Sequence, residues 1–148
     1  MKFTLEPADN EELEIIIRGN LSDPHVPQII AALNTARVIS RLFLYREEKE
    51  YLCPVGDISY FEALQGKIYA HTPQGTMEAR YKLYELADML HGSGFIQISK
   101  GILVNVHEVQ SVEPEFSGNY TAVLADRKTL TISRKYFKAF REYVVKEL

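Results

Sequence analysis

Four basic residues follow turns or predicted strands, where a folded domain presents its loops. Lys67 follows the turn Gln65-Gly66, Lys100 fills a polar break between two apolar runs, and Arg134 and Lys135 follow a predicted strand. An arginine can make a bidentate contact with a guanine in the major groove, and lysines can anchor phosphates. Ordinary solvated loop charges would leave the same pattern. From the residues alone, the interpretation as ordinary solvated loop charges is modestly favoured over DNA contact.

Residue patterns for catalysis or metal binding are missing from the sequence. No two of the four histidines stand three or four positions apart and no cysteine accompanies them, so scattered surface histidines are expected: His25, His71, His91 and His107. Gly92-Ser93-Gly94 has the glycines of a nucleophile turn, yet glycine is also the usual helix C-cap. Neither common glycine-rich phosphate loop occurs. We therefore expect no enzyme activity, no metal, no cofactor and no small-molecule substrate.

The composition is that of an ordinary globular protein. The chain has 148 residues, of which 46% are hydrophobic and 25% charged, enough for one domain or one domain with an appendage. The only cysteine, Cys53, lies in an apolar run and is expected to be a buried thiol without a disulfide. No apolar leader begins the chain, and no run is long enough to span a bilayer. These features predict a cytoplasmic location.

Charge is segregated along the chain, although the formal net charge is only −3. Residues 1–14 hold one lysine against five acidic residues, whereas residues 127–148 hold seven basic residues against two acidic ones. A basic contact face on an otherwise acidic protein would produce this asymmetry. A helix with a solvated lysine and arginine side would produce it equally well.

The central stretch of the chain, residues 94–112, explains how the basic break is held. Residues 95–98 read as an apolar strand, residues 102–105 as a buried run closed by asparagine, and residues 106–112 as a second alternating strand. Two buried runs on either side push Ser99 and Lys100 outward. A hydroxyl, a cation and the bare backbone of Gly101 are then available to an anionic partner.

The first fifty residues are predicted to form a strand-helix-strand unit. Residues 12–18 read as a strand and residues 41–46 as another. Between them, Ser22-Asp23-Pro24 is a good helix start. Apolar residues at helical spacing give this helix a single buried stripe, Val26, Ile29, Ile30 and Leu33. Closely spaced short strands begin near residue 50. The sequence therefore predicts a boundary there between an N-terminal extension, residues 1–50, and a second domain, residues 51–148.

The second domain reads as a sheet-rich fold with short helices. Closely spaced alternating strands are predicted at residues 51–53, 58–63, 67–72 and 76–80, and a hairpin at 120–133. A helix is predicted over residues 83–90. The last helix should bury Phe137, Phe140 and Val144. Because most aromatic residues fall on strands or helix stripes, they are expected in the core, and only Phe116 and Tyr120 lie near a turn.

Several ordered motifs of the second domain resemble the LytTR family of bacterial DNA-binding domains. The resemblance covers about two-thirds of the chain, and six pieces fall in register with the family: Ile58 to Glu62, Lys67 to Thr72, the helix at Leu83 to Leu90, the central motif from Gly94-Phe95 to Asn105, the Phe116 to Tyr120 turn, and Leu130 to Tyr136. The resemblance implies a mainly β fold with short helices (α+β), an elongated LytTR-like β-sandwich. It also implies a transcription regulator without catalytic activity, which inserts loops into the major grooves of double-stranded DNA.

The resemblance also implies which residues contact DNA. Base-reading positions fall on Gln65 to Lys67, on Ser99 and Lys100, and on Arg134, while Lys67, Lys135 and Lys138 would hold phosphates. The first loop is shorter than in some relatives, and the central motif has Gln97-Ile98-Ser99-Lys100-Gly101 where Arg-x-His-Arg-Ser is common. These departures predict a different target sequence.

Two hypotheses follow from the sequence. The favoured one is a cytoplasmic, sequence-specific regulator, similar to small stand-alone family members without a receiver domain and acting as a homodimer on repeated half-sites. The alternative is a protein-interaction module whose LytTR-like domain has lost DNA binding. In that case residues 1–50 would bind a membrane-protein or signalling partner. Basic loops scattered over several faces would favour the alternative.

Overall fold

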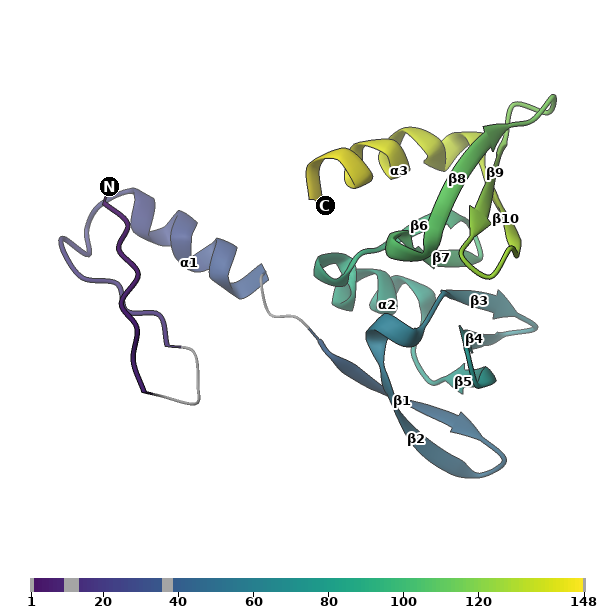
Figure 1. Ribbon diagram of the computed structural model, residues 1–148, viewed down its shortest axis with the longest axis horizontal. Helices are drawn as coiled ribbons and strands as arrows, with labels where there is room; N and C mark the ends of the chain where they lie inside the picture. The colour runs from purple at the N-terminus through teal and green to yellow at the C-terminus, as the bar shows by residue number, and fades with distance from the viewer. Residues whose placement is uncertain (1, 10–13, 36–38, 148) are drawn as a thin grey trace. The chain divides into compact units, whose positions relative to one another are not determined.

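The computed structural model describes residues 2–9, 14–35 and 39–147, and the chain divides into two compact units, residues 1–34 and 35–148 (Figure 1). In the first unit, the helix α1 (His25–Thr35) forms where the sequence predicts it. Its start is held by Asp23, whose carboxylate accepts hydrogen bonds from the His25 backbone N–H at 2.9 Å and from the ring Nδ1 at 2.8 Å. These bonds, the backbone one first, lower the pKa of Asp23.

Two predictions for the first unit are wrong. Residues 14–18, the described part of the strand expected at 12–18, are not in a strand. A strand needs a paired neighbour, and no strand is paired with this segment among the described residues. The apolar stripe of α1 is also not buried, because Val26, Ile29 and Leu33 are half-buried and Ile30 is 46% exposed.

The second unit is built on a seven-stranded antiparallel sheet in the order β2-β1-β5-β4-β3-β7-β6. Its strands are β1 (Arg41–Arg46), β2 (Lys49–Pro54), β3 (Tyr60–Leu64), β4 (Lys67–Thr72), β5 (Gly75–Ala79), β6 (Phe95–Ser99) and β7 (Ile102–Asn105). β1 buries alternate residues, as the period of a half-buried strand requires. The hairpin β1–β2 pairs from Arg41 opposite Pro54 to Arg46 opposite Lys49, so residue 50 lies inside it. A separate role for residues 1–50 stays a prediction.

A three-stranded sheet and two helices complete this unit (Figure 1). The sheet has the order β10-β9-β8, formed by β8 (Val109–Pro114), β9 (Tyr120–Leu124) and β10 (Thr129–Ile132). The helices are α2 (Leu83–Met89) and α3 (Arg134–Glu147), and short 3₁₀ turns lie at Val55–Asp57, His91–Ser93 and Val106–Glu108. The predicted fold class, mainly β with short helices, is confirmed.

Two hydrophobic clusters hold the elements together. The first packs α2 against the large sheet, with Phe61 and Phe95 fully buried and their rings 5.6 Å apart. The second joins β6 and β7 to the small sheet and α3 through Phe140 and its neighbours. Here the predicted stripe of α3 is corrected: Tyr143 is buried and its hydroxyl donates to the His91 carbonyl, whereas Val144 is 38% exposed.

Cys53 is buried, as predicted, and lies in the first cluster on β2. Burial, and to a smaller extent the charge of Asp57, raises the pKa of its thiol. A thiol with a raised pKa is protonated at neutral pH and is a poor nucleophile, which agrees with a packing role for this side chain.

The central stretch of the chain departs from its predicted pattern at one point. Residues 106–108 form a 3₁₀ turn instead of the start of a strand. The cause is Asn105, which is 2% exposed: its side-chain oxygen accepts from the His107 N–H at 3.1 Å and its Nδ2 donates to the Ile58 carbonyl at 3.1 Å. An asparagine that bonds the backbone two residues ahead favours a turn over an extended strand.

Gly94 directly precedes β6, the strand that carries the central motif, and its conformation favours glycine. Its φ is +92°, and a Cβ atom at this position would lie 2.6 Å from the ring of His107. We expect Gly94→Ala to lower the free energy of unfolding by about 1 to 3 kcal/mol, from backbone strain and steric overlap together. Urea unfolding monitored by circular dichroism measures the change.

The matched control for Gly94→Ala is Gly56→Ala. Gly56 has no positive φ, and no atom lies within 4 Å of a Cβ placed there. Its substitution should leave stability unchanged or raise it by up to about 1 kcal/mol. Adding His107→Ala to Gly94→Ala should recover only the part of the loss due to overlap. Equal effects of the two glycine substitutions would contradict the explanation.

Candidate nucleic-acid interface

Three connections of the second unit meet along one edge, which we call the loop edge. It consists of the β3–β4 turn (Gln65-Gly66), the β6–β7 loop (Lys100-Gly101) and the β10–α3 junction (Ser133-Arg134). Backbone hydrogen bonds join the three: Ala63 N–H donates to the Gly101 carbonyl at 2.8 Å, and Ser133 N–H donates to the Ile98 carbonyl at 2.9 Å. The three connections therefore lie near one another in the second unit.

The β3–β4 turn presents its two tip residues with positive φ, +52° for Gln65 and +79° for Gly66. This is the geometry of a type I′ hairpin turn, which matches the twist of the flanking strands. Gln65 is exposed at the tip. Lys67 is also exposed, but its ammonium lies 3.9 Å from the Glu78 carboxylate, so its charge is partly compensated by a surface ion pair.

The β6–β7 loop confirms the polar break that the sequence predicts. Ser99 ends β6 half-buried, Lys100 is exposed, and Ile102 begins β7. The Gln97 amide donates to the Lys100 carbonyl at 3.2 Å and so braces the loop from inside the strand. Since Ile98 and Leu103 are fully buried on either side, the loop is anchored at both ends.

Arg134 is the first residue of α3 and is held by the β8–β9 loop. Its backbone N–H donates to the Asn119 side-chain oxygen at 3.1 Å. Its side chain lies over Gly118, because a Cβ atom at that glycine would be 3.4 Å from the Arg134 Cδ and Nη1 atoms. The backbone is thus fixed and the side chain supported, while the residue as a whole remains exposed.

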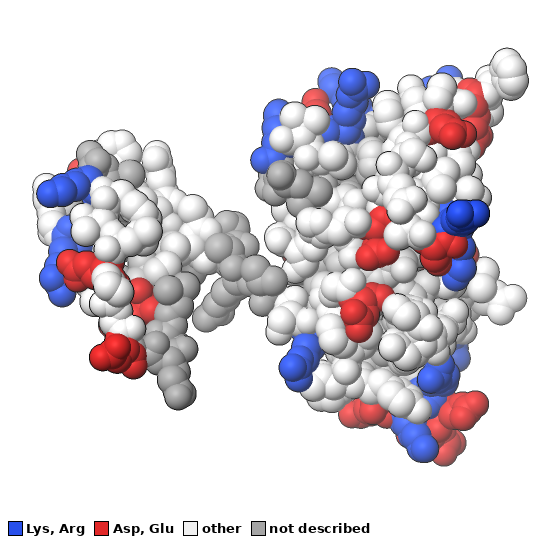
Figure 2. All heavy atoms as spheres, viewed as in Figure 1, with Lys and Arg blue, Asp and Glu red and all other residues white. Residues whose placement is uncertain are grey.

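The first turn of α3 contains no acidic residue. Helix N-termini carry a partial positive charge and usually attract acidic side chains, whereas here Arg134, Lys135 and Lys138 are added to it. In Figure 2, Lys and Arg side chains gather over α3. None of these three cations has a carboxylate within 4.0 Å in the described part of the chain. An anion such as phosphate would complement this end of the helix.

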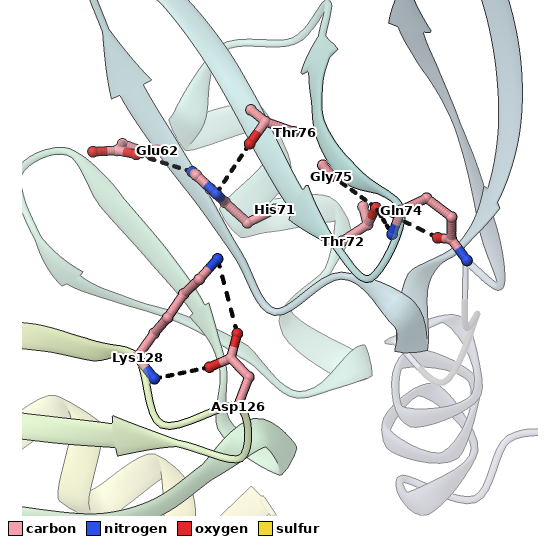
Figure 3. Close-up of polar contacts among 8 residues, drawn as sticks. All are labelled: Glu62, His71, Thr72, Gln74, Gly75, Thr76, Asp126 and Lys128. Carbon is pink, nitrogen blue, oxygen red and sulfur yellow. Dashed lines mark hydrogen bonds and ion pairs between the residues drawn. The ribbon is translucent and has the colours of Figure 1, made fainter.

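A polar network braces the strands that carry the β3–β4 turn (Figure 3). The His71 Nε2 lies 2.9 Å from the Glu62 carboxylate, and its Nδ1 lies 3.4 Å from the Thr76 hydroxyl, so β3, β4 and β5 are linked by side chains. The Tyr60 ring stacks on His71 with centroids 4.0 Å apart. Burial first, and then the charges of Glu62 and Asp126, raise the pKa of Tyr60.

Each residue proposed from the sequence for DNA contact lies on one of these connections or next to one. Gln65 lies in the β3–β4 turn and Lys67 follows it, Ser99 and Lys100 lie at the β6–β7 loop, and Arg134 begins α3 with Lys135 and Lys138 on its first turns. Sequence reasoning missed the residues that hold them, which are Gln97, Gly118 and Asn119. The only signal for the last two was their place in the Phe116 to Tyr120 motif.

A mainly β domain with cations and a helix N-terminus along one edge has the features expected of a module that binds a polyanion. The model of the LytTr DNA-binding domain matches residues 48–144, and the chain belongs to this family. A solved LytTr DNA-binding domain from Bacillus cereus covers 72% of this chain and 97% of its own, with a TM-score of 0.68 and 22% identity. That likeness agrees with the fold described above.

Similarity to sequence relatives extends beyond the family domain. An uncharacterised HTH-type transcriptional regulator of Staphylococcus aureus strain N315 is 29% identical over 143 residues, covering 96% of this chain and 97% of its own. One from strain MSSA476 is 28% identical over 135 residues, covering 91% of each. These matches are longer than the family domain, so they take in part of the N-terminal unit as well.

Proposed function

We propose that this protein is a DNA-binding transcriptional regulator that reads duplex DNA with the loop edge. The observation that carries the proposal is the backbone-bonded convergence of three basic connections beside the N-terminus of α3. Membership of the LytTr DNA-binding domain family and the similarity to named transcriptional regulators support it.

The loops, and not a recognition helix, are the reading elements in this proposal. In the described residues no two α-helices follow one another directly, since β1 follows α1, β6 comes after α2, and α3 follows β10. A helix-turn-helix arrangement needs two consecutive helices, the second of which enters the major groove. The edge of a sheet with two-residue turns is narrow enough to enter that groove instead.

Each residue of the loop edge has a proposed role. Arg134, with its fixed backbone and open guanidinium, is assigned to a bidentate contact with guanine. Ser99 and Lys100 read or position the adjacent base pairs, and Gln65 contacts the next stretch of groove. Lys67, Lys135 and Lys138 hold phosphates, with Lys67 contributing least because of its ion pair with Glu78.

Catalysis is not part of the proposed function. No group of three or more potential metal ligands is found in the described residues, and no described helix is long and apolar enough to cross a membrane. We propose a cytoplasmic location, because a regulator of this kind acts on DNA in the bacterial cytoplasm. We also propose that it acts as a homodimer, since regulators on repeated half-sites gain affinity from two linked contacts.

A second candidate function concerns residues 1–50, which contain the first unit and β1. Among its described residues, large apolar side chains are exposed, including Phe3 at 84%, Leu5 at 83% and Leu21 at 68%. Such exposure in one small segment is typical of a surface that binds a partner. We propose that residues 1–50 receive the input, either from a second subunit or from a membrane-protein or signalling partner, while the LytTr domain binds DNA.

Selection of bound duplexes from a random pool at near-physiological salt tests the main proposal. Enrichment of a repeated motif is expected, and its spacing would set the geometry of the dimer. If the folded protein enriches no motif, the proposal fails and the interaction-module hypothesis gains. The oligomeric state, measured by analytical ultracentrifugation of the full chain, tests the homodimer separately.

The salt dependence of binding measures how many phosphates the protein contacts. The logarithm of the affinity should fall linearly with the logarithm of the salt concentration, with a slope of about −0.9 for each neutralised phosphate. Replacing Lys138 by Gln should reduce the slope by about one and weaken target and scrambled duplexes equally. The control Lys49→Gln, on the exposed end of β2, should leave the slope unchanged. An unchanged slope for Lys138→Gln would remove this residue from the phosphate contacts.

A further inference from the structure

One large apolar side chain beside the loop edge has no packing role. Phe116, in the β8–β9 loop, is fully exposed and is the most exposed of the large apolar residues described. Its neighbours in the motif behave differently: Tyr120 stacks on Phe137 with ring centroids 3.5 Å apart. Exposure of a whole phenylalanine ring to water is unfavourable relative to burial, and a binding surface recovers this cost in the complex.

The loop that carries Phe116 is held in one conformation by hydrogen bonds. The Glu115 N–H donates to the Asn119 carbonyl at 2.9 Å, and the Gly118 N–H donates to the Glu115 carbonyl at 3.1 Å. The Glu115 carboxylate accepts from the Ser117 hydroxyl at 3.1 Å and from the Thr121 hydroxyl. The ring is therefore presented on a closed, preorganised turn, so little conformational entropy is lost when it binds.

The same loop supports Arg134 at the loop edge. Gly118 lies against the Arg134 side chain, and Asn119 accepts from its N–H. Phe116 is two residues before Gly118, and two residues of chain span at most about 7 Å. That length corresponds to about two base-pair steps of 3.4 Å along the duplex. In Figure 1 the β8–β9 loop extends from the upper end of the small sheet, and the β3–β4 turn lies lower on the right of the same unit.

We propose that Phe116 is a specificity-determining residue that contacts the C5-methyl group of a thymine within two base pairs of the guanine read by Arg134. The proposal rests on the proposed function. Thymine is the only base that presents a methyl group in the major groove, and a phenyl ring is one of the side chains suited to contact it. Arg134 and Phe116 together then read a guanine and a nearby thymine from one rigid support.

Replacement of thymine by deoxyuridine tests the contact, because it removes only the C5-methyl group of one base. Once selection has defined the site, duplexes are made with each thymine changed singly, and their affinities are measured by fluorescence anisotropy. The parent protein should lose about fourfold in affinity at one thymine beside the Arg134 contact, the effect of one buried methyl group. Phe116→Ala should bind the thymine duplex about tenfold more weakly and lose its sensitivity to that replacement.

The matched control is Tyr84→Ala, which removes another exposed aromatic ring, on α2 and outside the loop edge. It should bind both duplexes as the parent does. Phe116→Leu should retain part of the preference for thymine. The proposal is overturned if the selected site has no such thymine, if no replacement affects the parent, or if Phe116→Ala loses affinity but keeps the parent's sensitivity. Failure of the proposed function is distinct, because the parent itself would then select no duplex.

Discussion

Replacing Arg134 by Ala should weaken binding to the selected duplex by about 1 to 3 kcal/mol and relax the preference for guanine at one position of each half-site. The reason is geometric as well as electrostatic, since the Arg134 backbone is fixed by Asn119 and the guanidinium is supported by Gly118. Arg134→Lys should restore much of the affinity for phosphate but little of the preference, because an ammonium lacks the planar fork of donors. Anisotropy titrations with target and single-substituted duplexes measure both quantities.

Arg41→Ala is the control for the loss of one positive charge. Arg41 is an exposed arginine on β1, a strand that lies outside the loop edge. Its replacement should change the affinity for the selected duplex by no more than about twofold, because charges beyond a Debye length are screened. Both variants should unfold within about 0.5 kcal/mol of the parent, as surface substitutions do. An Arg134→Ala protein that keeps the parent's affinity and preference would remove Arg134 from base reading.

Replacing Phe95 by Ala should lower the free energy of unfolding by about 3 to 5 kcal/mol, a large part of the 5 to 15 kcal/mol available to a domain of this kind. Phe95 is 1% exposed, packs on the ring of Phe61 and begins the strand that leads to Lys100. Removing the ring leaves a cavity between α2 and the large sheet, which the surrounding elements can only partly fill. The midpoint of urea unfolding, at an unchanged slope, measures the loss.

Phe116→Ala makes the same chemical change at a fully exposed position and is the natural control. It should alter the free energy of unfolding by less than about 0.5 kcal/mol. The two variants therefore separate stability from recognition. Phe95→Ala should lose DNA binding only in proportion to the fraction of protein that unfolds, whereas Phe116→Ala should lose DNA binding while it stays folded. A loss below about 1 kcal/mol for Phe95→Ala would contradict the packing described for β6.

The fold of residues 39–147 follows closely from local patterns in the sequence. Alternating apolar residues define β1, an apolar run defines β6, and helical spacing defines α2, because each element buries apolar residues against a neighbour. The errors lie where a specific side-chain hydrogen bond overrides the pattern. Asn105 turns a predicted strand into a 3₁₀ turn, and the bond from Tyr143 to His91 selects the face of α3. Spacing alone could not distinguish Tyr143 from Val144, since each lies one helical turn beyond Phe140.

The candidate interface was partly predictable for a different reason. Lysines and arginines at turns can be read from the sequence, but the proximity of these turns depends on the order β4-β3-β7-β6 and on two backbone hydrogen bonds, each of which joins one connection to a neighbouring strand. The supporting residues carry no local signal. Asn119 caps a helix that begins 15 residues later in the chain, and no spacing rule connects the two. The sequence placed Phe116 near a turn and outside the expected core, but its full exposure became evident only from the structure.

The hydrogen bond between Ser133 and Ile98 has a consequence for the protein during its synthesis. The loop edge combines residues from Gln65 to Arg134, so a ribosome must release most of the second unit before the edge can form. Until α3 emerges, β6 lacks the helix that packs on it and Arg134 is missing from the edge, although its supports Gly118 and Asn119 have already been made. On the proposed function, a nascent chain would hold nucleic acid only through weak, sequence-independent attraction. Selective binding would begin only once α3 has folded onto β6.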